Sequence, residues 1–290
     1  MPDFAIVDSH VHLYDPTWIR HSWLAKVPKI NRRFDLSDFD RCRAEVMVDQ
    51  LVFAEVAVDQ GLHFAEAAWV QELADQDPRL AGMVAHAPLE KGAAVEADLA
   101  RLLQYRSLRG IRRLIEGEAD PSICLAPDFL DGLRLLPKHG LTFDICLKHW
   151  GLVFAIELAR RCPEVQFVLD HIGKPGIKHG LVEPWQSQLR ELARQPNVVC
   201  KLSGVITEAD HLHWRREQVR PYVAHVLECF GFDRVMYGSD WTVSELTHRY
   251  PEWVAILDEI TAGCSKDELA RFWRGTAIRT YRLDSSTAAS

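Results

Sequence analysis

The sequence predicts an α/β protein built as a single (β/α)8 barrel of the TIM type. Eight short runs rich in Val, Ile, Leu and Phe recur along the 290 residues, and each is followed by a longer segment with helical spacing. The runs are continuously apolar rather than alternating, which is typical of parallel strands covered on both faces. Eight such units favour a closed barrel, with a doubly wound open sheet as the alternative.

The predicted strands are bounded by turn residues or by the start of a helical pattern, and β-branched residues are frequent in them. In chain order they are Ala5–Val11, Leu51–Val58, Leu80–Ala87, Gly110–Ile115, Leu141–Leu147, Gln166–His171, Val198–Leu202 and Val235–Gly238.

The segments between the strands repeat their apolar residues every three or four positions, which predicts helices. They are Asp38–Asp49, Leu62–Gln76, Val95–Leu103, Phe129–His139, Leu152–Arg161, Glu183–Arg194 and Tyr222–Phe230, followed by Glu252–Ile260 and Lys266–Thr276. A loop from Leu13 to Leu36 separates the first strand from its helix. Such connections usually have about 2–6 residues, so a loop of this length indicates a functional lid.

Composition and charge limit the class of protein. The net charge of −7 argues against nucleic acid or an anionic membrane as the main partner, because both need a basic face. No window approaches a membrane span, and no signal peptide is evident. The seven cysteines are scattered without a Cys-x-x-Cys pair, which predicts reduced thiols in a cytoplasmic protein. We expect one domain over residues 1–283 and a disordered tail over 284–290.

The most informative motif is His10-Val11-His12, at the end of the first predicted strand. A strand repeats its side-chain direction every two residues, so His10 and His12 point the same way. Neutral imidazole nitrogens at this spacing suit one divalent cation. Two surface histidines would be the plain alternative.

Ionisable residues also close most of the other predicted strands. The C-terminal strand ends of a TIM-type barrel carry its catalytic groups, and charged residues are rarely buried without a partner. The pattern therefore indicates a site at one mouth of the barrel. Its members are Glu55, His86, Arg112, Arg113, Lys148, His149, Asp170, His171, Lys201 and Asp240.

Several of these residues have a structural alternative. Asp170 and His171 could form a salt link, and Asp240 could cap the segment that follows it. Glu55 could be a metal ligand or a structural carboxylate. His86 and His149 could be core histidines bonded to backbone carbonyls.

The motifs resemble the amidohydrolase superfamily, and specifically its amidohydrolase-2 group of lactonases and related decarboxylases. The resemblance rests on Val7-Asp8-Ser9-His10-Val11-His12, Phe167-Val168-Leu169-Asp170-His171-Ile172-Gly173-Lys174-Pro175, Lys201-Leu202-Ser203-Gly204, Arg234-Val235-Met236-Tyr237-Gly238-Ser239-Asp240-Trp241, Gly275-Thr276-Ala277 and Tyr281. These motifs span almost the whole chain in order. One departure is Asp240-Trp241-Thr242, where the group usually has Asp-Trp-Pro.

The resemblance implies a metal-dependent hydrolase that opens a sugar-acid lactone, such as the aldono-1,5-lactone L-fucono-lactone, to the sugar acid. A metal-dependent decarboxylase of an aromatic carboxylic acid is the alternative. The expected cation is zinc, with manganese as the second choice, and it would lower the pKa of a bound water. Its expected ligands are His10, His12, His171 and Asp240, with Glu55 as a further candidate.

Three residues are expected to act in catalysis, because their chemistry suits ester hydrolysis. Asp240 would take a proton from the attacking water and return it to the leaving oxygen. Arg112 would bind the carbonyl oxygen, and His171 would hold the cation. Substrate contacts are expected from Arg112, Lys148, His149, Trp18, Trp23, Trp150 and Trp241, since indole faces suit the C–H faces of a sugar. The expected partner is therefore a small-molecule sugar lactone, with a homo-oligomer as an open alternative.

Overall fold

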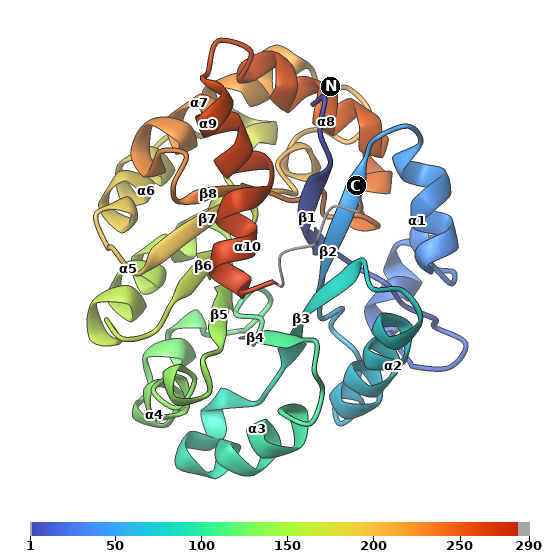
Figure 1. Ribbon diagram of the computed structural model, residues 1–290. Coiled ribbons are helices and arrows are strands. Elements are labelled where there is room, and N and C mark those ends of the chain that lie inside the picture. Colours follow the sequence, from blue (N-terminus) through green and yellow to red (C-terminus); the bar gives the residue numbers. More distant parts are fainter. Residues whose placement is uncertain (1, 284–290) are drawn as a thin grey trace.

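The computed structural model describes residues 2–283, and eight parallel strands form a nearly closed barrel there (Figure 1). The strands follow chain order around the barrel, and an isolated parallel bridge between Val11 and Trp241 joins the last strand's end to the first. The strands are β1 (Ile6–Val11), β2 (Val48–Ala54), β3 (Leu80–His86), β4 (Leu108–Arg112), β5 (Thr142–Ile145), β6 (Phe167–Leu169), β7 (Val198–Leu202) and β8 (Val235–Tyr237). The predicted (β/α)8 fold is thereby confirmed.

Helices surround the strands in Figure 1, and α10 lies across one end of the barrel. The helices are α1 (Leu36–Arg43), α2 (His63–Gln76), α3 (Glu96–Leu102), α4 (Pro127–Leu133), α5 (Leu152–Arg161), α6 (Trp185–Ala193), α7 (Arg216–Phe230), α8 (Tyr250–Ile260), α9 (Lys266–Ala270) and α10 (Thr276–Tyr281). The predicted disordered tail lies outside the described residues.

Each predicted strand is present, but some boundaries differ for local reasons. The helix expected to run to Asp49 ends at Arg43, because Ala44 has a φ of 52° and β2 already begins at Val48. Glu55 consequently follows β2 rather than lying inside it. Helix α7 begins at Arg216, before the predicted start at Tyr222. Proline disfavours a helix interior, but Pro221 is accommodated inside α7.

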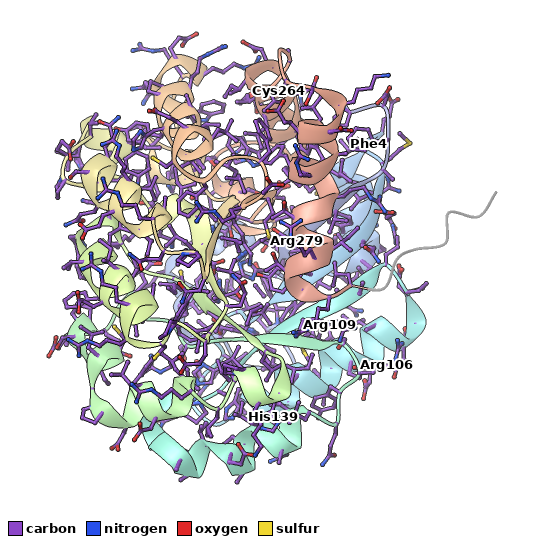
Figure 2. The ribbon with its side chains drawn as sticks, turned by 60° about the vertical axis from the view of Figure 1, so that its left-hand side comes forward. Phe4, Arg106, Arg109, His139, Cys264 and Arg279 are labelled. Carbon is purple, nitrogen blue, oxygen red and sulfur yellow. The ribbon has the colours of Figure 1, made fainter. Side chains whose placement is uncertain are left out.

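The inside of the barrel begins with an apolar layer at its N-terminal end. The layer takes one inward-facing residue from most strands, and α10 and the residue after its C-cap close it from below. Its members are Val7, Val52, Val84, Val168, Val199 and Met236 from the strands, with Ala277, Tyr281 and Leu283 from the closing segment. Figure 2 labels Arg279 of α10 and, lower in the same view, Arg106 and Arg109 around the start of β4.

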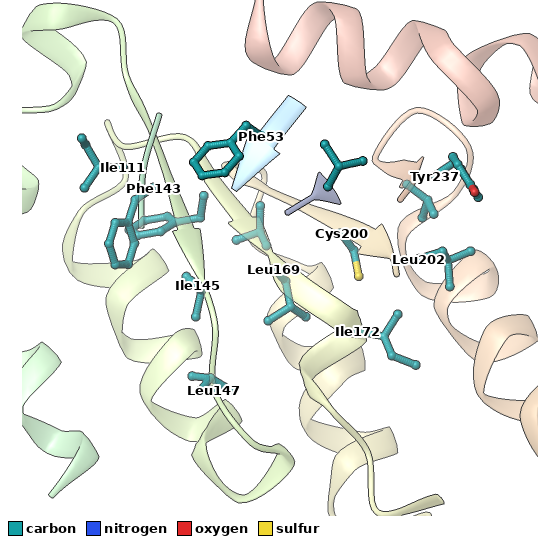
Figure 3. Close-up of a cluster of buried hydrophobic side chains, with 14 of the residues drawn as sticks. Phe53, Ile111, Phe143, Ile145, Leu147, Leu169, Ile172, Cys200, Leu202 and Tyr237 are labelled. Carbon is teal, nitrogen blue, oxygen red and sulfur yellow. The ribbon is translucent and has the colours of Figure 1, made fainter. Parts of the chain in front are cut away.

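The alternate strand positions face outward and form the larger core with the helices. Figure 3 shows Phe143 and Ile145 of β5, with Leu169 and Leu202 from the next two strands, among these buried side chains. Period-two alternation thus gives every strand one face toward the barrel and one toward the helices, and both faces are buried. This explains the continuously apolar runs in the sequence.

Above the apolar layer lies a chain of buried charges that we call the charged layer. It consists of Glu55, Arg112, Asp170, Lys201 and Asp144, which are all at most 3% exposed. The charges alternate in sign along their contacts, at 2.8, 3.0, 3.1 and 2.6 Å in that order. The hydroxyl of Tyr281 also donates to Asp144 at 2.6 Å, which ties α10 to the layer.

The long loop between β1 and α1 is anchored to the barrel rather than free. Tyr14 and Phe34 form an antiparallel bridge, so the loop closes on itself at its base. The hydroxyl of Thr242 donates to that of Tyr14, which in turn donates to the carbonyl of Ile30. The peptide bond between Trp241 and Thr242 is cis.

The seven cysteines are free thiols, as the sequence predicts. Within residues 2–283, no helix has both the length and the apolar character needed to span a bilayer.

Replacing Lys201 with Met should lower the free energy of unfolding by about 3–5 kcal/mol, because it leaves buried carboxylates without their cation. Urea denaturation measures the change. Lys178→Met is the matched control, since the Lys178 side chain is 55% exposed in its ion pair with Asp210. This second substitution should cost less than about 1 kcal/mol. Equal losses for the two variants would show that the charged layer does not contribute as described.

Candidate active site

His10 and His12 meet at the C-terminal end of β1, as the His-x-His spacing predicts. Their Nε2 atoms lie 3.2 Å apart, and the two side chains are almost completely buried. The pairing of β1 with β2 shifts register between Asp8 and Val11, so the strand is irregular where it carries His10. Asp8 holds this segment, because its carboxylate accepts hydrogen bonds from the backbone N–H groups of His10 and Ser239.

The proton of His12 can be assigned from its surroundings. Its Nδ1 lies 2.8 Å from the backbone carbonyl of Ala54, which can only accept a hydrogen bond. Nδ1 therefore carries the proton, and in the neutral ring Nε2 presents a lone pair toward His10. A histidine oriented in this way by a carbonyl is the usual arrangement of a metal ligand.

Asp240 and His171 complete the cluster from the ends of β8 and β6. Asp240 Oδ1 lies 3.3 Å from Nε2 of His12, 3.8 Å from Nε2 of His10 and 4.0 Å from Nε2 of His171. We call His10, His12, His171 and Asp240 the His3Asp cluster. The four residues that the sequence predicts as ligands are therefore brought to one point at the barrel mouth.

The backbone is adapted to this convergence. His171 and Asp240 have φ values of 53° and 57°, in the left-handed region that non-glycine residues rarely adopt. Gly204 passes so close that a Cβ there would lie 2.6 Å from His171 Nδ1 and 2.7 Å from Asp240 Oδ2. Only glycine fits at this position, and unusual conformations of this kind concentrate at functional sites.

The ionisation states of the cluster suit a divalent cation. Burial lowers the pKa of His171 to about 4 and that of His10 well below its usual value, so both rings are neutral at pH 7. Burial opposes ionisation of Asp240, but His171, His12 and His10 outweigh it and hold its pKa well below the usual range. Neutral imidazoles and one carboxylate are the donor set that zinc and similar ions prefer. The cluster could therefore hold such an ion.

The charged layer supports the cluster from below. His10 Nδ1 lies 3.4 Å from Asp170 and 3.2 Å from the Lys201 ammonium, while Arg112 Nη1 lies 3.3 Å from His10 Nε2. His10 thus has a charged neighbour within 3.4 Å of each ring nitrogen. The ion pairs of Asp170 are with Arg112 and Lys201 and not with His171, the partner that its position next in the sequence suggests.

Glu55 and Arg112 lie beside the cluster but are engaged with each other. Arg112 Nε donates to Glu55 Oε1 at 2.8 Å, and Glu55 Oε2 accepts from the backbone of Ala57 at 2.8 Å. Among the described residues, Glu55 belongs to neither group whose ligand atoms converge as a metal site would need. In this structure the Glu55 carboxylate neutralises Arg112, and its role as a metal ligand stays a prediction. Contact between Arg112 and substrate stays a prediction.

The tryptophans expected at the rim occupy different environments. Trp241 is completely buried and packs edge-to-face on Phe34 and Phe39, so its expected rim position is wrong. Trp23 is half-buried and donates to the Val56 carbonyl. Trp18 and Trp150 are exposed, and their contact with substrate stays a prediction.

Two pockets open among the loops at the C-terminal end of the barrel. The β2–β4 pocket, of about 480 Å³, is lined by residues that include Glu55, His63, His86, Glu90, Lys91 and Arg113. The β5–β7 pocket, of about 570 Å³, is lined by residues that include Lys148, His149, Lys178, His179, Glu208 and Asp210. Both volumes lie within the range of small-molecule sites, about 300–1,000 Å³.

Lys148 and His149 line the β5–β7 pocket and are engaged with neighbouring residues there. Lys148 pairs with Glu116 at 3.0 Å and with Glu208 at 3.3 Å, while His149 Nδ1 lies 3.1 Å from the Lys174 carbonyl. Their expected contact with substrate therefore depends on which pocket the substrate enters.

His248 also lies in the site region, although no sequence motif points to it. It is 7% exposed in the segment before α8, where burial lowers its pKa to about 4 and the charge of Asp240 opposes that shift. The residue belongs to none of the motifs, and it does not end a strand. Its position becomes evident only when the segment folds back over the barrel mouth.

Comparison with known proteins shows the family of the chain. A family model described as Amidohydrolase matches residues 7–283. Two proteins named L-fucono-1,5-lactonase, from Burkholderia ambifaria and Burkholderia multivorans, are each 31% identical to this chain, with 96% of both partners covered in each comparison.

Solved structures show the same relationship. An amidohydrolase from Burkholderia multivorans, crystallised with bound zinc, superposes with a TM-score of 0.87 at 28% identity, covering 97% of this chain and 100% of the other. The 5-carboxyvanillate decarboxylase of Sphingomonas paucimobilis has a TM-score of 0.63 at 14% identity, covering 96% and 99%, and shares the fold alone. The chain belongs to the amidohydrolase family.

Proposed function

We propose that this protein is a zinc-dependent lactonase that opens an aldono-1,5-lactone, such as L-fucono-lactone, to the sugar acid. The observation that carries the proposal is the convergence of three imidazoles and one carboxylate at the barrel mouth. The two lactonase relatives at 31% identity support the choice of substrate class. The decarboxylase at 14% identity gives no comparable support for the alternative reaction.

The cluster supplies the groups that ester hydrolysis needs. When held by the His3Asp cluster, zinc, or manganese in its place, supplies a Lewis acid that lowers the pKa of water. Asp240 is ionised and accepts a proton from the attacking water. As the proton leaves, the water oxygen bonds to the lactone carbonyl carbon. When the ring C–O bond breaks, Asp240 returns that proton to the leaving alkoxide, which stays tethered in the product.

Arg112 positions His10, and its charge can also stabilise negative charge in the transition state. Its ion pairs with Glu55 and Asp170 fix the guanidinium, whose Nη1 lies 3.3 Å from His10 Nε2. This fixed positive charge lies beside His10 of the cluster, where we expect negative charge to develop on the carbonyl oxygen. Preorganised charge of this kind stabilises the transition state without reorganisation.

A screen of aldonolactones with zinc-loaded protein and a pH indicator tests the proposed activity, because opening each lactone releases one proton. Rapid acidification with an aldono-1,5-lactone is expected. An aromatic acid panel monitored for carbon dioxide provides the opposing arm. Carbon dioxide release without lactone opening would favour the decarboxylase.

The metal assignment predicts that replacing His10 and His12 together with Ala removes bound zinc, since two of four ligands disappear. Elemental analysis of dialysed protein measures the metal content. His211→Ala, which removes an exposed histidine, is the control and should keep full occupancy. Full zinc content in the double variant would contradict the assignment.

Asp240→Asn keeps the shape and one oxygen of the side chain but removes the proton acceptor. Lactone turnover should fall by about 10²–10⁴-fold, the usual effect of losing a general acid–base group. Metal content should fall less, because three histidines remain. If Asp240 only capped a structural turn, thermal stability would fall while turnover per folded molecule stayed nearly unchanged. Measuring turnover, zinc content and thermal stability on one purified variant separates these roles.

A further inference from the structure

We propose that the β2–β4 pocket binds the ring hydroxyls of a neutral polyhydroxylated lactone, and that His86 is the residue that recognises them. The inference rests on the proposed lactonase function, which places the lactone carbonyl at the His3Asp cluster. It assigns the rest of the substrate to one of the two pockets and names a specificity-determining side chain.

The position of His86 on β3 places it on the face of the strand that points into the barrel. Val84 lies in the apolar layer inside the barrel, so His86, two residues later, faces the same way. His86 is also paired in register with Arg112 of β4. Since Arg112 lies 3.3 Å from His10, His86 stands one strand away from a residue that touches the cluster.

Glu55 joins the pocket to the cluster. Its side chain bonds Arg112 Nε at 2.8 Å, and the same residue lines the β2–β4 pocket. The pocket wall and the cluster are therefore connected by a chain of only two side chains, Glu55 and Arg112. The β2–β4 pocket is therefore the space within two side chains of the cluster where we place the lactone ring.

The charges of the pocket are already compensated within the protein. Each charged side chain named above on the pocket wall forms an ion pair with an oppositely charged residue at 3.1 Å or closer. The pairs are Arg113 with Glu90 and Glu118, Lys91 with Asp98, and Glu55 with Arg112. A neutral ligand with many hydroxyls suits such a wall, which offers donors and acceptors without excess charge. The carboxylate of an aromatic acid would find its cations already engaged.

His86 offers the hydrogen-bonding pair that a hydroxyl needs. Within residues 2–283 its ring nitrogens have no hydrogen-bond partner, and its ring centroid lies 5.2 Å from that of His63. Burial lowers the pKa of both histidines, so each ring is neutral at pH 7. A neutral imidazole has one donor and one acceptor, as a hydroxyl does.

Binding of an aldono-1,5-lactam tests the proposal without depending on turnover, since this neutral ring keeps the hydroxyls of the lactone. Titration calorimetry on zinc-loaded protein should give a Kd about tenfold higher for His86→Ala than for the wild type, the effect of losing one good hydrogen bond. His86→Gln, which keeps a donor and an acceptor, should restore most of the affinity. The unsubstituted lactam 2-piperidinone should bind the wild type and His86→Ala equally.

His179→Ala is the matched control, because His179 lines the β5–β7 pocket. It should leave the Kd of the aldonolactam unchanged. A higher Kd for His179→Ala but not for His86→Ala would place the sugar in the other pocket and overturn the proposal. If His86→Ala weakened binding of 2-piperidinone as much as binding of the aldonolactam, the proposal would also be overturned. His86 would then contact the lactam ring itself or stabilise the fold, and it would not recognise the hydroxyls.

Parallel kinetics separate this proposal from the lactonase assignment. If wild-type protein opens no lactone but binds the aldonolactam through His86, the lactonase function fails and the pocket assignment stands. If it opens an aldono-1,5-lactone while His86→Ala leaves the aldonolactam Kd unchanged, the pocket assignment fails and the lactonase function stands. For a correct proposal, kcat/KM of His86→Ala should fall about tenfold for the aldonolactone and stay constant for δ-valerolactone, which has no hydroxyls.

Discussion

The ion pairs of Lys201 with Asp144 and Asp170 are the interaction on which the rest of this barrel depends. A buried ammonium between two buried carboxylates links β5, β6 and β7 through their side chains, and Arg112 continues the chain to β4 and Glu55. Replacing buried pairs with apolar residues often leaves stability unchanged, so their presence points to a role in specificity. Here that role is to fix His10, which contacts Asp170, Lys201 and Arg112.

Two further features constrain the position of the His3Asp cluster. The left-handed backbone at His171 and Asp240 turns both side chains inward, and Gly204 leaves the space that they need. Asp8 then connects β1 to the segment after β8 through the N–H of Ser239 and the hydroxyl of Tyr250. The cluster is thus held from at least four strands, which limits the freedom of each ligand before any cation binds.

The sequence predicts the eight strands and the convergence of His10, His12, His171 and Asp240, because side-chain period and strand-end position are local properties. It does not predict the pairing of Glu55 with Arg112, since residues 57 positions apart meet only after the barrel closes. The predicted rim position of Trp241 is wrong for a related reason. An indole at the end of a strand can face either the barrel mouth or the surrounding helices, and the sequence does not distinguish the two. His248 is missed because its approach to Asp240 depends on the path of a loop without periodicity.

The closing segment at the foot of the barrel has a consequence for synthesis of the protein. Tyr281 donates its hydroxyl to Asp144, and Leu283 packs with Val7, Val52 and Val84 of the first strands. The nascent chain therefore cannot shield its interior from water until residues near 283 have left the ribosome. Until then the N-terminal end of the barrel stays open, and the apolar side chains of the first strands remain exposed. Chaperones that bind exposed apolar surface can therefore bind the nascent chain until this segment has been translated.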